Sequence, residues 1–385
     1  MDDHRSMCGK RALFGWMYQR LLKPVLFRFP ADDVHERFLA IGRSLGRSRS
    51  IRSMIAWLWR YDDQRLVQTV SGLVFPNPIG LSAGLDYRAD LSALAPSLGF
   101  GFHSIGTLTL EPYAGNPRPM LDRLPKSRAL LVNKGFRNEG IAAVLARIGP
   151  SADPRPPRGV SIGATNRPYP DFSALIADIV DGFRTAERFA GFDYYELNIS
   201  CPNLVNLRDV KPEIGSPEGL SRLLAALSPV VLARPVFIKM PLERTEADML
   251  ALVDTARPHA FIKGLILSNL AKDRSNPAFD RAEIAKAGPG NFSGKPTQAQ
   301  SNAMLRTLYR HCRGRFVLIG TGGVFTAEDA YAKILAGASL VQLVTGMIYE
   351  GPQVIGSINA GLAEYLVRDG YASVSDAVGA RADRG

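Results

Sequence analysis

The amino-acid sequence predicts a barrel of eight parallel strands alternating with helices, a (β/α)8 or TIM barrel of the α/β class, with a small helical extension before it. From about residue 72 onward, short apolar segments end in Gly, Ser, Thr or Asn, and helical stretches separate most of them. Continuous apolar strands that alternate with helices are typical of a parallel sheet covered on both faces. Eight such units indicate a closed barrel, and an open doubly wound sheet is the competing architecture. The segments are 79–82, 103–106, 159–163, 194–199, 236–240, 261–268, 316–320 and 340–345.

The part of the chain before the barrel is predicted to be helical. We expect residues 1–65 to form the extension, residues 66–370 the barrel and residues 371–385 a tail. A first helix is expected to be interrupted at Pro24, and a second is expected from about Asp32 to Leu45, with Asp32 or Asp33 as its cap. A third is expected around residues 51–59. Two polar segments, 150–157 and 272–296, are expected to be surface loops, the second of them over the site.

The charge distribution favours a membrane surface over a nucleic acid as a partner. The net charge is +11, and residues 1–65 carry 13 Lys and Arg against 7 Asp and Glu, or +6 of that total. This basic segment is also rich in Trp, Leu, Ile and Phe, which suits an interfacial helix. A helical cap packed on the barrel is the alternative interpretation, and both are compatible. No nucleic-acid-binding signature is apparent in the sequence.

Targeting and cysteine usage favour a reducing compartment. The sequence contains no run of 18 apolar residues, so no bilayer span is expected, and its start does not resemble a secretory signal. Cys8, Cys201 and Cys312 are too sparse and too widely spaced for a disulfide framework. We therefore expect a peripheral protein on the cytoplasmic face of the cell membrane.

Glycines after the last two predicted strands indicate a phosphate site. Gly322 and Gly323 follow one apolar strand, and Thr345 and Gly346 follow the next. Glycines at these places let backbone N–H groups approach a phosphate closely, and such a site is recurrent at this end of barrels. Tight packing turns are the alternative interpretation. The motif by itself indicates a phosphate without naming the molecule that carries it.

Polar residues end several other predicted strands. Asparagine amides suit a planar ring with both C=O and N–H edges, and they occur at Asn133, Asn198, Asn203 and Asn269. Lys239 ends an apolar strand, where it either stabilises negative charge on a ligand or forms an internal salt bridge. Cys201, between Ser200 and Pro202, is either a nucleophile, a general base or an inert loop residue. No Cys/His cluster surrounds it, so no metal is expected.

Together these residues resemble the dihydroorotate dehydrogenase family over nearly all of residues 30–365. The motifs that carry the resemblance are NPIG at 77–80, AGLD at 83–86, GFGF at 99–102, IGT at 105–107, GNPRP at 115–119, NISCPN at 198–203, SGKP at 293–296, GTGG at 320–323 and AGASLVQ at 336–342. Their order and spacing are highly specific in combination. The resemblance implies an FMN-binding barrel, and the helical extension is similar to that of the membrane-associated class, which passes electrons to a quinone.

The resemblance also implies roles for individual residues. Cys201 falls at the general base, which removes a proton from C5 of dihydroorotate while hydride leaves C6 for the flavin and orotate forms. Positions expected to contact the substrate are Asn133, Phe136, Asn198, Asn203 and Asn269. Positions expected to contact FMN are Ala83, Gly84, Thr107, Asn166, Lys239, Ser268, Gly294, Gly322, Gly323, Thr345 and Gly346. His35 and Arg123 match residues of the quinone tunnel.

Several positions depart from the family pattern. Tyr87 stands where the family has a lysine near the substrate carboxylate, and we expect Arg88, one position away, to compensate. Cys201 is typical of the soluble class, whereas the membrane class uses serine. Leu270 replaces a hydroxyl residue, and Val344 replaces a tyrosine near the quinone. The loop 132–136 is one residue shorter than usual, and the segment 162–166 lacks the family's lysine.

These departures leave two alternatives beside quinone-dependent dihydroorotate oxidation. The first is a divergent FMN oxidoreductase that acts on another cyclic amide or an enoate, which the missing lysine motivates. The second is a non-catalytic flavoprotein of the membrane surface. Turnover of dihydroorotate separates the first alternative from the family activity, and reoxidation of the flavin by a quinone excludes the second.

Overall fold

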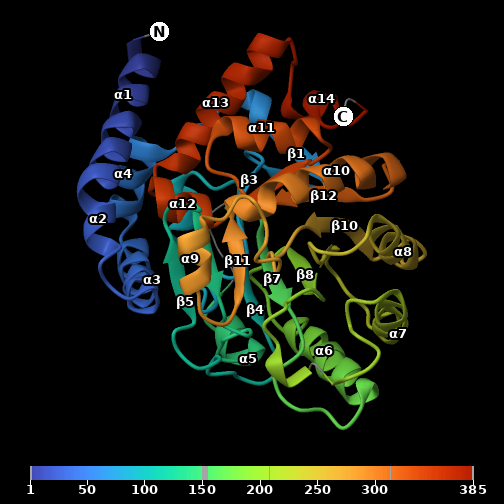
Figure 1. Cartoon of the computed structure of the whole chain (residues 1–385). Helices are drawn as coiled ribbons and strands as arrows, with labels where there is room; N and C mark the ends of the chain where they lie inside the picture. Colours follow the sequence, from blue (N-terminus) through green and yellow to red (C-terminus); the bar gives the residue numbers. More distant parts are fainter. Residues whose placement is uncertain (1, 150–154, 208, 313, 384–385) are drawn as a thin grey trace.

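The centre of the computed structural model is a closed barrel of eight parallel strands (Figure 1). The structure describes residues 2–149, 155–207, 209–312 and 314–383, without the side chains of residues 2–8. Each of the eight predicted segments forms a barrel strand, so the predicted fold class is confirmed. In the order of their pairing, the strands are β10 (Ile262–Leu267), β12 (Val317–Thr321), β13 (Leu340–Leu343), β3 (Ile79–Leu81), β4 (Phe102–Leu108), β7 (Arg158–Ile162), β8 (Tyr194–Asn198) and β9 (Val236–Lys239).

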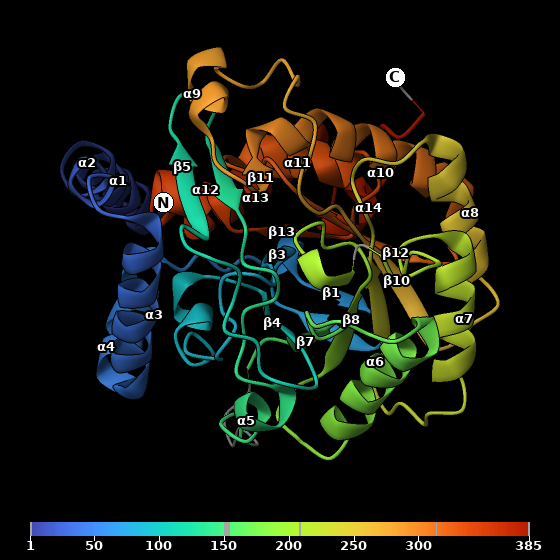
Figure 2. The same cartoon turned by 60° about the horizontal axis from the view of Figure 1, so that its bottom comes forward.

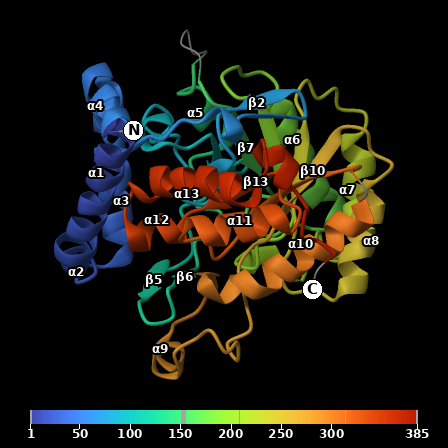
Figure 3. The same cartoon turned by 90° about the horizontal axis from the view of Figure 1, so that it is seen from above.

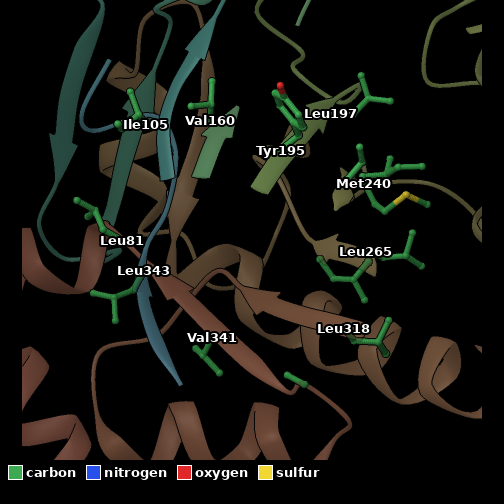
Figure 4. Packing of buried hydrophobic residues seen from close by; sticks show 14 of the residues in the cluster. Leu81, Ile105, Val160, Tyr195, Leu197, Met240, Leu265, Leu318, Val341 and Leu343 are labelled. Carbon is green, nitrogen blue, oxygen red and sulfur yellow. The ribbon is translucent and has the colours of Figure 1, made fainter. Parts of the chain in front are cut away.

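Helices surround the barrel and cover the outward-facing side chains of its strands. The helices that form an arc around the strands in Figure 2 are α6 (Phe172–Ala186), α7 (Pro217–Leu227), α8 (Glu246–Ala256), α10 (Gln298–Cys312) and α11 (Ala327–Leu335). Figure 4 shows the buried apolar side chains around the ring of strands, among them Val160, Leu265 and Val341. Tyr195 of β8, for example, packs against Phe183 of α6 with ring centroids 5.0 Å apart. Burial on both faces explains why these strands have continuous apolar sequences.

The amino-terminal end of the barrel is closed. A hairpin of β1 (Gln68–Val70) and β2 (Leu73–Phe75) places Val70 and Phe75 against the interior residues Phe102 and Phe237. The rings of Phe75 and Phe102 meet edge to face, with centroids 5.4 Å apart. The carboxyl end of the strands is therefore the end at which a ligand can enter.

A second, three-stranded sheet stands at the carboxyl end of the barrel. It consists of β5 (Leu121–Leu124), β6 (Ala129–Val132) and β11 (Asn291–Gly294), all antiparallel. The prediction that residues 272–296 form a loop is therefore wrong, because this segment contains β11 and a helix, α9 (Arg281–Lys286). Phe279 and Phe292 are buried in it with ring centroids 4.7 Å apart, and this small core holds the segment in place. Residues 150–154 of the other predicted loop lie outside the described part of the chain.

The extension consists of α1 (Asp2–Met17), α2 (Lys23–Leu26), α3 (Ala31–Arg47) and α4 (Arg49–Trp59), which lie on one flank of the barrel (Figure 1). Pro24 does not interrupt the first helix as predicted. A π-helical turn, Tyr18–Leu22, joins α1 to α2 and leaves Pro24 in the first turn of α2, where its missing N–H is tolerated. No helix in the described ranges is both long and apolar enough to cross a bilayer.

Neither predicted cap of α3 is correct, because Pro30 occupies the N-cap position. Asp32 instead accepts a hydrogen bond from the backbone N–H of Met120 at 2.9 Å, and Asp33 forms an ion pair with Arg118 at 3.0 Å. Both carboxylates therefore tie α3 to the chain just before β5. This places α3 beside the carboxyl end of the barrel.

The extension also packs against the end of the barrel chain. Helices α12 (Thr345–Glu350) and α13 (Val354–Asp369) reach from the barrel toward it (Figure 3), and α13 contacts both α1 and α4. A Cβ at Gly356 would lie 1.7 Å from the carbonyl oxygen of Trp59, so only glycine permits this approach. Residues after α13 include α14 (Val374–Ala377), whose Val374 and Ala377 are buried against the barrel helices.

Candidate functional site

A cavity of about 540 Å³ opens at the carboxyl end of the barrel strands. Strand ends and the loops after them line one part of it, and α1, α2 and α3 line the other. Because the carboxyl ends of parallel strands meet at one rim, residues far apart in the sequence come together there. The predicted site residues that line this cavity are His35, Ala83, Gly84, Thr107, Arg123, Phe136, Asn198, Cys201, Asn203, Lys239, Ser268, Asn269, Gly294, Gly322, Gly323, Thr345 and Gly346.

Glycines at one end of the cavity bring the backbone close to a ligand. Gly322 and Gly323 follow β12 with φ of +94° and +70°, a region that favours glycine. A Cβ at Gly346 would lie 2.0 Å from the carbonyl oxygen of Val324. Gly346 is in the first turn of α12, whose leading N–H groups have no partner within the helix. This end of the cavity therefore has the backbone geometry of a phosphate site.

The floor of the cavity carries buried polar side chains. The ammonium group of Lys239 donates to the hydroxyl of Ser82 at 3.3 Å, and burial lowers the pKa of Lys239. The Asn198 amide donates to the hydroxyl of Thr107 at 2.9 Å. In the described part of the chain, the buried hydroxyl of Ser268 has no hydrogen-bond partner. Buried polar groups normally have partners, so this hydroxyl is suited to a ligand in the cavity.

Cys201 lies on the loop after β8, in the wall of the cavity. Burial raises the pKa of its thiol to about 11, while the Asn203 backbone N–H and the charge of Lys239 oppose the rise. The amide of Asn269 donates to the hydroxyl of Ser200, the residue before Cys201, at 2.8 Å. Hydrogen bonds therefore connect the thiol's loop to the strand end after β10.

Asn203 connects this loop to the three-stranded sheet. Its amide donates to the carbonyl of Val132 at 2.9 Å, and its side-chain oxygen accepts from the amide of Asn291 at 2.6 Å. The loop that bears the thiol is thus held to both β6 and β11. The asparagines are consequently part of the wall's own hydrogen-bond network.

Three predicted site residues do not line the cavity. Arg88 forms ion pairs with Glu36 at 3.1 Å and Asp90 at 2.9 Å, so its expected role as a replacement for the missing lysine is not supported. Asn133 accepts a hydrogen bond from Asn116 at 3.0 Å. Asn166 donates to Asn116 at 3.3 Å and to the carbonyl of Gly135, also at 3.3 Å. Asn116, which belongs to the GNPRP motif but was not predicted as a site residue, therefore holds both asparagines against the loop 133–136.

The mouth of the cavity is apolar and belongs mostly to the extension. Residues of α1 and the π-helical turn that line it include Phe14, Leu21 and Leu22. Arg123 crosses this mouth with its guanidinium 4.7 Å from the ring of Phe27, and it donates to the carbonyl of Phe29 at 2.9 Å. An apolar entrance with one half-buried cation suits a ligand that is largely hydrophobic with a polar end.

His35 and Lys134 lie between this mouth and the floor. His35 contacts the carbonyl of Leu85 through Nε2 at 2.9 Å and the ammonium group of Lys134 through Nδ1 at 2.9 Å. Burial, reinforced by Lys134, holds the pKa of His35 well below its usual range. Lys134 was not predicted as a site residue. The available signal was that it directly follows Asn133, which was predicted as one.

A family model described as dihydroorotate dehydrogenase matches residues 65–366. The chain belongs to the dihydroorotate dehydrogenase family. It is 36% identical to the dihydroorotate dehydrogenase (quinone) of Roseiflexus castenholzii, over 95% of this chain and 98% of that protein. It is also 36% identical to the protein of the same name from Deinococcus deserti, over 95% of this chain and 100% of that one.

Solved structures of the same family share the fold. DHODH from Eimeria tenella in complex with ferulenol superposes with a TM-score of 0.75 at 27% identity, over 88% of this chain and 96% of that one. The ligand-free form gives a TM-score of 0.76 at 28% identity, over 87% of this chain and 98% of that one. The barrel and its helical extension are thus family features.

Dihydroorotate dehydrogenases are flavin-dependent oxidoreductases, and the residues of this cavity fit a flavin. Gly322, Gly323 and Gly346 bring backbone from the loops after β12 and β13 into the lining of the cavity. The unpartnered Ser268 hydroxyl and the Lys239 ammonium group face the same cavity. Among the described residues, no group of three or more His, Cys, Asp or Glu side chains is arranged to hold a metal ion.

Proposed function

We propose that this dihydroorotate dehydrogenase binds FMN in the cavity, oxidises dihydroorotate to orotate and passes the electrons to a quinone. The observation that carries the proposal is the continuity of one cavity. Its lining joins the glycines after β12 and β13, the Cys201 thiol and the apolar mouth formed by the extension. A cofactor that would take electrons from a polar substrate and pass them to an apolar acceptor requires a cavity with both kinds of lining.

FMN is held by residues from several strand ends. Backbone groups at Gly322, Gly323 and Gly346, with the Thr345 hydroxyl, bind its phosphate. Lys239 would place a buried positive charge beside bound FMN, which would favour negative charge on the ring system. Ala83, Gly84, Thr107, Ser268 and Gly294 complete the lining against the ring and its ribityl chain. Bound FMN supplies the acceptor for the hydride that leaves C6 of dihydroorotate.

Cys201 is the general base. Its thiolate takes the proton from C5 of dihydroorotate, and the sulfur retains that proton until it returns to solvent. Asn198, Asn203 and Asn269 hold the C=O and N–H edges of the dihydropyrimidine ring, and Phe136 packs beside it. The high pKa of the thiol makes the thiolate a strong base but a scarce one at neutral pH.

The extension forms the quinone site and its membrane contact. Arg123 offers a charge to the polar head of the quinone at the mouth, and His35 lies deeper on the path to the floor. Large apolar side chains of the extension remain exposed, namely Leu13, Trp16, Met17, Leu21, Leu22, Val25, Phe29, Ile41, Met54 and Trp57. Together with the +6 charge of residues 1–65, this surface suits a peripheral contact with anionic lipid on the cytoplasmic face.

Removing residues 1–30 tests the membrane contact. The truncated protein is expected to stay in solution when mixed with vesicles that contain anionic lipid, while the full chain sediments with them. Bleaching of the flavin by dihydroorotate is the control that the barrel remains intact. Equal sedimentation of the two proteins contradicts the contact.

The test of the whole proposal is anaerobic reduction of the purified protein. We expect a yellow flavin spectrum that bleaches on addition of dihydroorotate and returns on addition of a quinone. The alternative is oxidation of another cyclic amide or an enoate, which the substitution at Tyr87 and the ion pairs of Arg88 with Glu36 and Asp90 favour. A protein that stays yellow with dihydroorotate supports that alternative, and a colourless protein that takes up no FMN refutes both.

A further inference from the structure

Among the described residues, four Lys and Arg side chains line the cavity. Contacts with other protein groups account for the positions of three of them. Arg137 forms an ion pair with Glu36 at 2.8 Å. Arg123 spans the apolar mouth, where it donates to the carbonyl of Phe29. Lys239 lies on the floor near Cys201 and donates to Ser82. The fourth, Lys134, lies within ion-pair distance of no described carboxylate.

The contacts of the His35 ring show that Lys134 is the donor in the hydrogen bond between them. The carbonyl oxygen of Leu85 can only accept, so the Nε2 atom of His35, 2.9 Å away, carries the ring proton. The Nδ1 atom of this neutral imidazole is then an acceptor, and the Lys134 ammonium group donates to it at 2.9 Å. An ammonium group has three donors, and this one also lies over the ring face of Tyr87, 4.8 Å from the ring centroid. Donors therefore remain for a ligand.

Lys134 is also buried without an adequate counter-charge. It is 8% exposed, and burial lowers its pKa to about 7. Glu36 and Asp32 of α3 raise that pKa, whereas Arg88 and Arg137 lower it. A cation removed from water is costly unless an anion compensates it. A carboxylate bound in the cavity would provide that compensation.

Lys134 lies beside Tyr87, and it follows by two positions a residue that is hydrogen-bonded to Asn203. Its ammonium group lies over the ring of Tyr87, the residue that stands where a lysine was expected, and Tyr87 is itself held by a hydrogen bond to Glu36. The carbonyl of Val132, two residues before Lys134, accepts from the Asn203 amide at 2.9 Å. A cation from the loop after β6 thus occupies the surroundings of the substituted position.

We infer that Lys134 binds the carboxylate of dihydroorotate and of orotate in this enzyme. The inference rests on the proposed function and assigns the substrate's negative charge to a residue outside the loop 83–88. It also explains how the site tolerates tyrosine at position 87 and an Arg88 that faces Glu36 and Asp90. Lys134 then selects a carboxylated ring over the same ring without a carboxylate.

Calorimetric titration of the flavin-loaded full chain tests this role with orotate and with uracil, which has the same ring and no carboxylate. Lys134→Met is expected to weaken orotate binding by about thirty-fold to a few thousand-fold. Uracil binding and FMN content are expected to remain unchanged. Lys134→Arg is expected to recover part of the orotate affinity. The matched control is Lys126→Met, a 71% exposed lysine in the turn between β5 and β6, which is expected to bind orotate normally.

Three results overturn the inference. They are unchanged orotate affinity in Lys134→Met, an equal loss of orotate and uracil affinity in that variant, and a loss of orotate affinity in Arg88→Met that Lys134→Met does not share. If Lys134→Met fails to retain FMN, Lys134→Gln provides the same comparison with a polar side chain. The proposed function is judged separately, by bleaching of the unmodified protein with dihydroorotate.

Discussion

Reduction of the flavin by dihydroorotate is expected to accelerate about tenfold for each pH unit from pH 7 to pH 10. The cause is the Cys201 thiol, whose pKa burial raises to about 11. At pH 7 the thiol is four pH units below that pKa, so about one molecule in 10⁴ carries the thiolate. Each unit corresponds to about 1.36 kcal/mol, so forming the base costs about 5 kcal/mol at that pH. The rate is therefore limited by the scarcity of thiolate across the neutral range.

Stopped-flow bleaching under anaerobic conditions, with saturating dihydroorotate, measures this profile. Cys201→Ser is expected to lower the rate by roughly 10²- to 10⁴-fold at each pH, because a serine hydroxyl is a weaker acid than a thiol and less of it is deprotonated. Cys312→Ser is the matched control, since burial also raises the pKa of Cys312 to about 11 but this residue lies in α10, outside the cavity. A rate that levels off near pH 8.5, or a profile that Cys312→Ser alters, would rule out a buried Cys201 thiolate as the limiting base.

Three further substitutions separate the parts of the cavity. Arg123→Ala is expected to slow reoxidation by a quinone while bleaching by dihydroorotate stays normal, and equal slowing of both would contradict its place at the mouth. Gly346→Ala puts a Cβ 2.0 Å from the Val324 carbonyl oxygen, so purified protein should lose its flavin colour; a fully yellow variant argues against the phosphate site. Asn203→Ala leaves the Asn291 amide and the Val132 carbonyl without their partner. In denaturant titrations this should lower the free energy of unfolding by about 1–3 kcal/mol, and orotate binding should weaken. An unchanged unfolding midpoint would show that the network is dispensable.

The barrel could be predicted from the sequence because its strands are buried on both faces. Strands such as β9 and β12 have continuous apolar sequences that end in a polar residue, and helices separate them. The sheet of β5, β6 and β11 gave no such signal. Its strands are four residues each, and β11 pairs with β6 across more than 150 residues of chain, a contact that local patterns do not encode.

The site was predictable where it depends on local backbone and not where it depends on distant pairing. Gly322, Gly323 and Gly346 could be recognised because glycines directly after a barrel strand indicate a close approach of the backbone. The direction of Arg88 could not be predicted, because it is set by the carboxylates of Glu36 and Asp90, one of them on α3. Lys134 was missed for the same reason. Its contacts are with His35 and Tyr87, which are distant in the sequence and come together only in the fold.

The way in which β11 is held fixes one wall of the cavity. One edge of β11 pairs with β6, and Phe292 exchanges two backbone hydrogen bonds of 2.8 Å with Ala271 on the other, so backbone hydrogen bonds hold both edges of this strand. The segment between β8 and α7 contains only one short helical turn, Val205–Leu207, in its described part, and it carries Cys201. Asn203 of that segment bonds to the Val132 carbonyl of β6 and to the Asn291 amide of β11. The place of the Cys201 thiol is therefore set by a strand that is itself hydrogen-bonded along both of its edges.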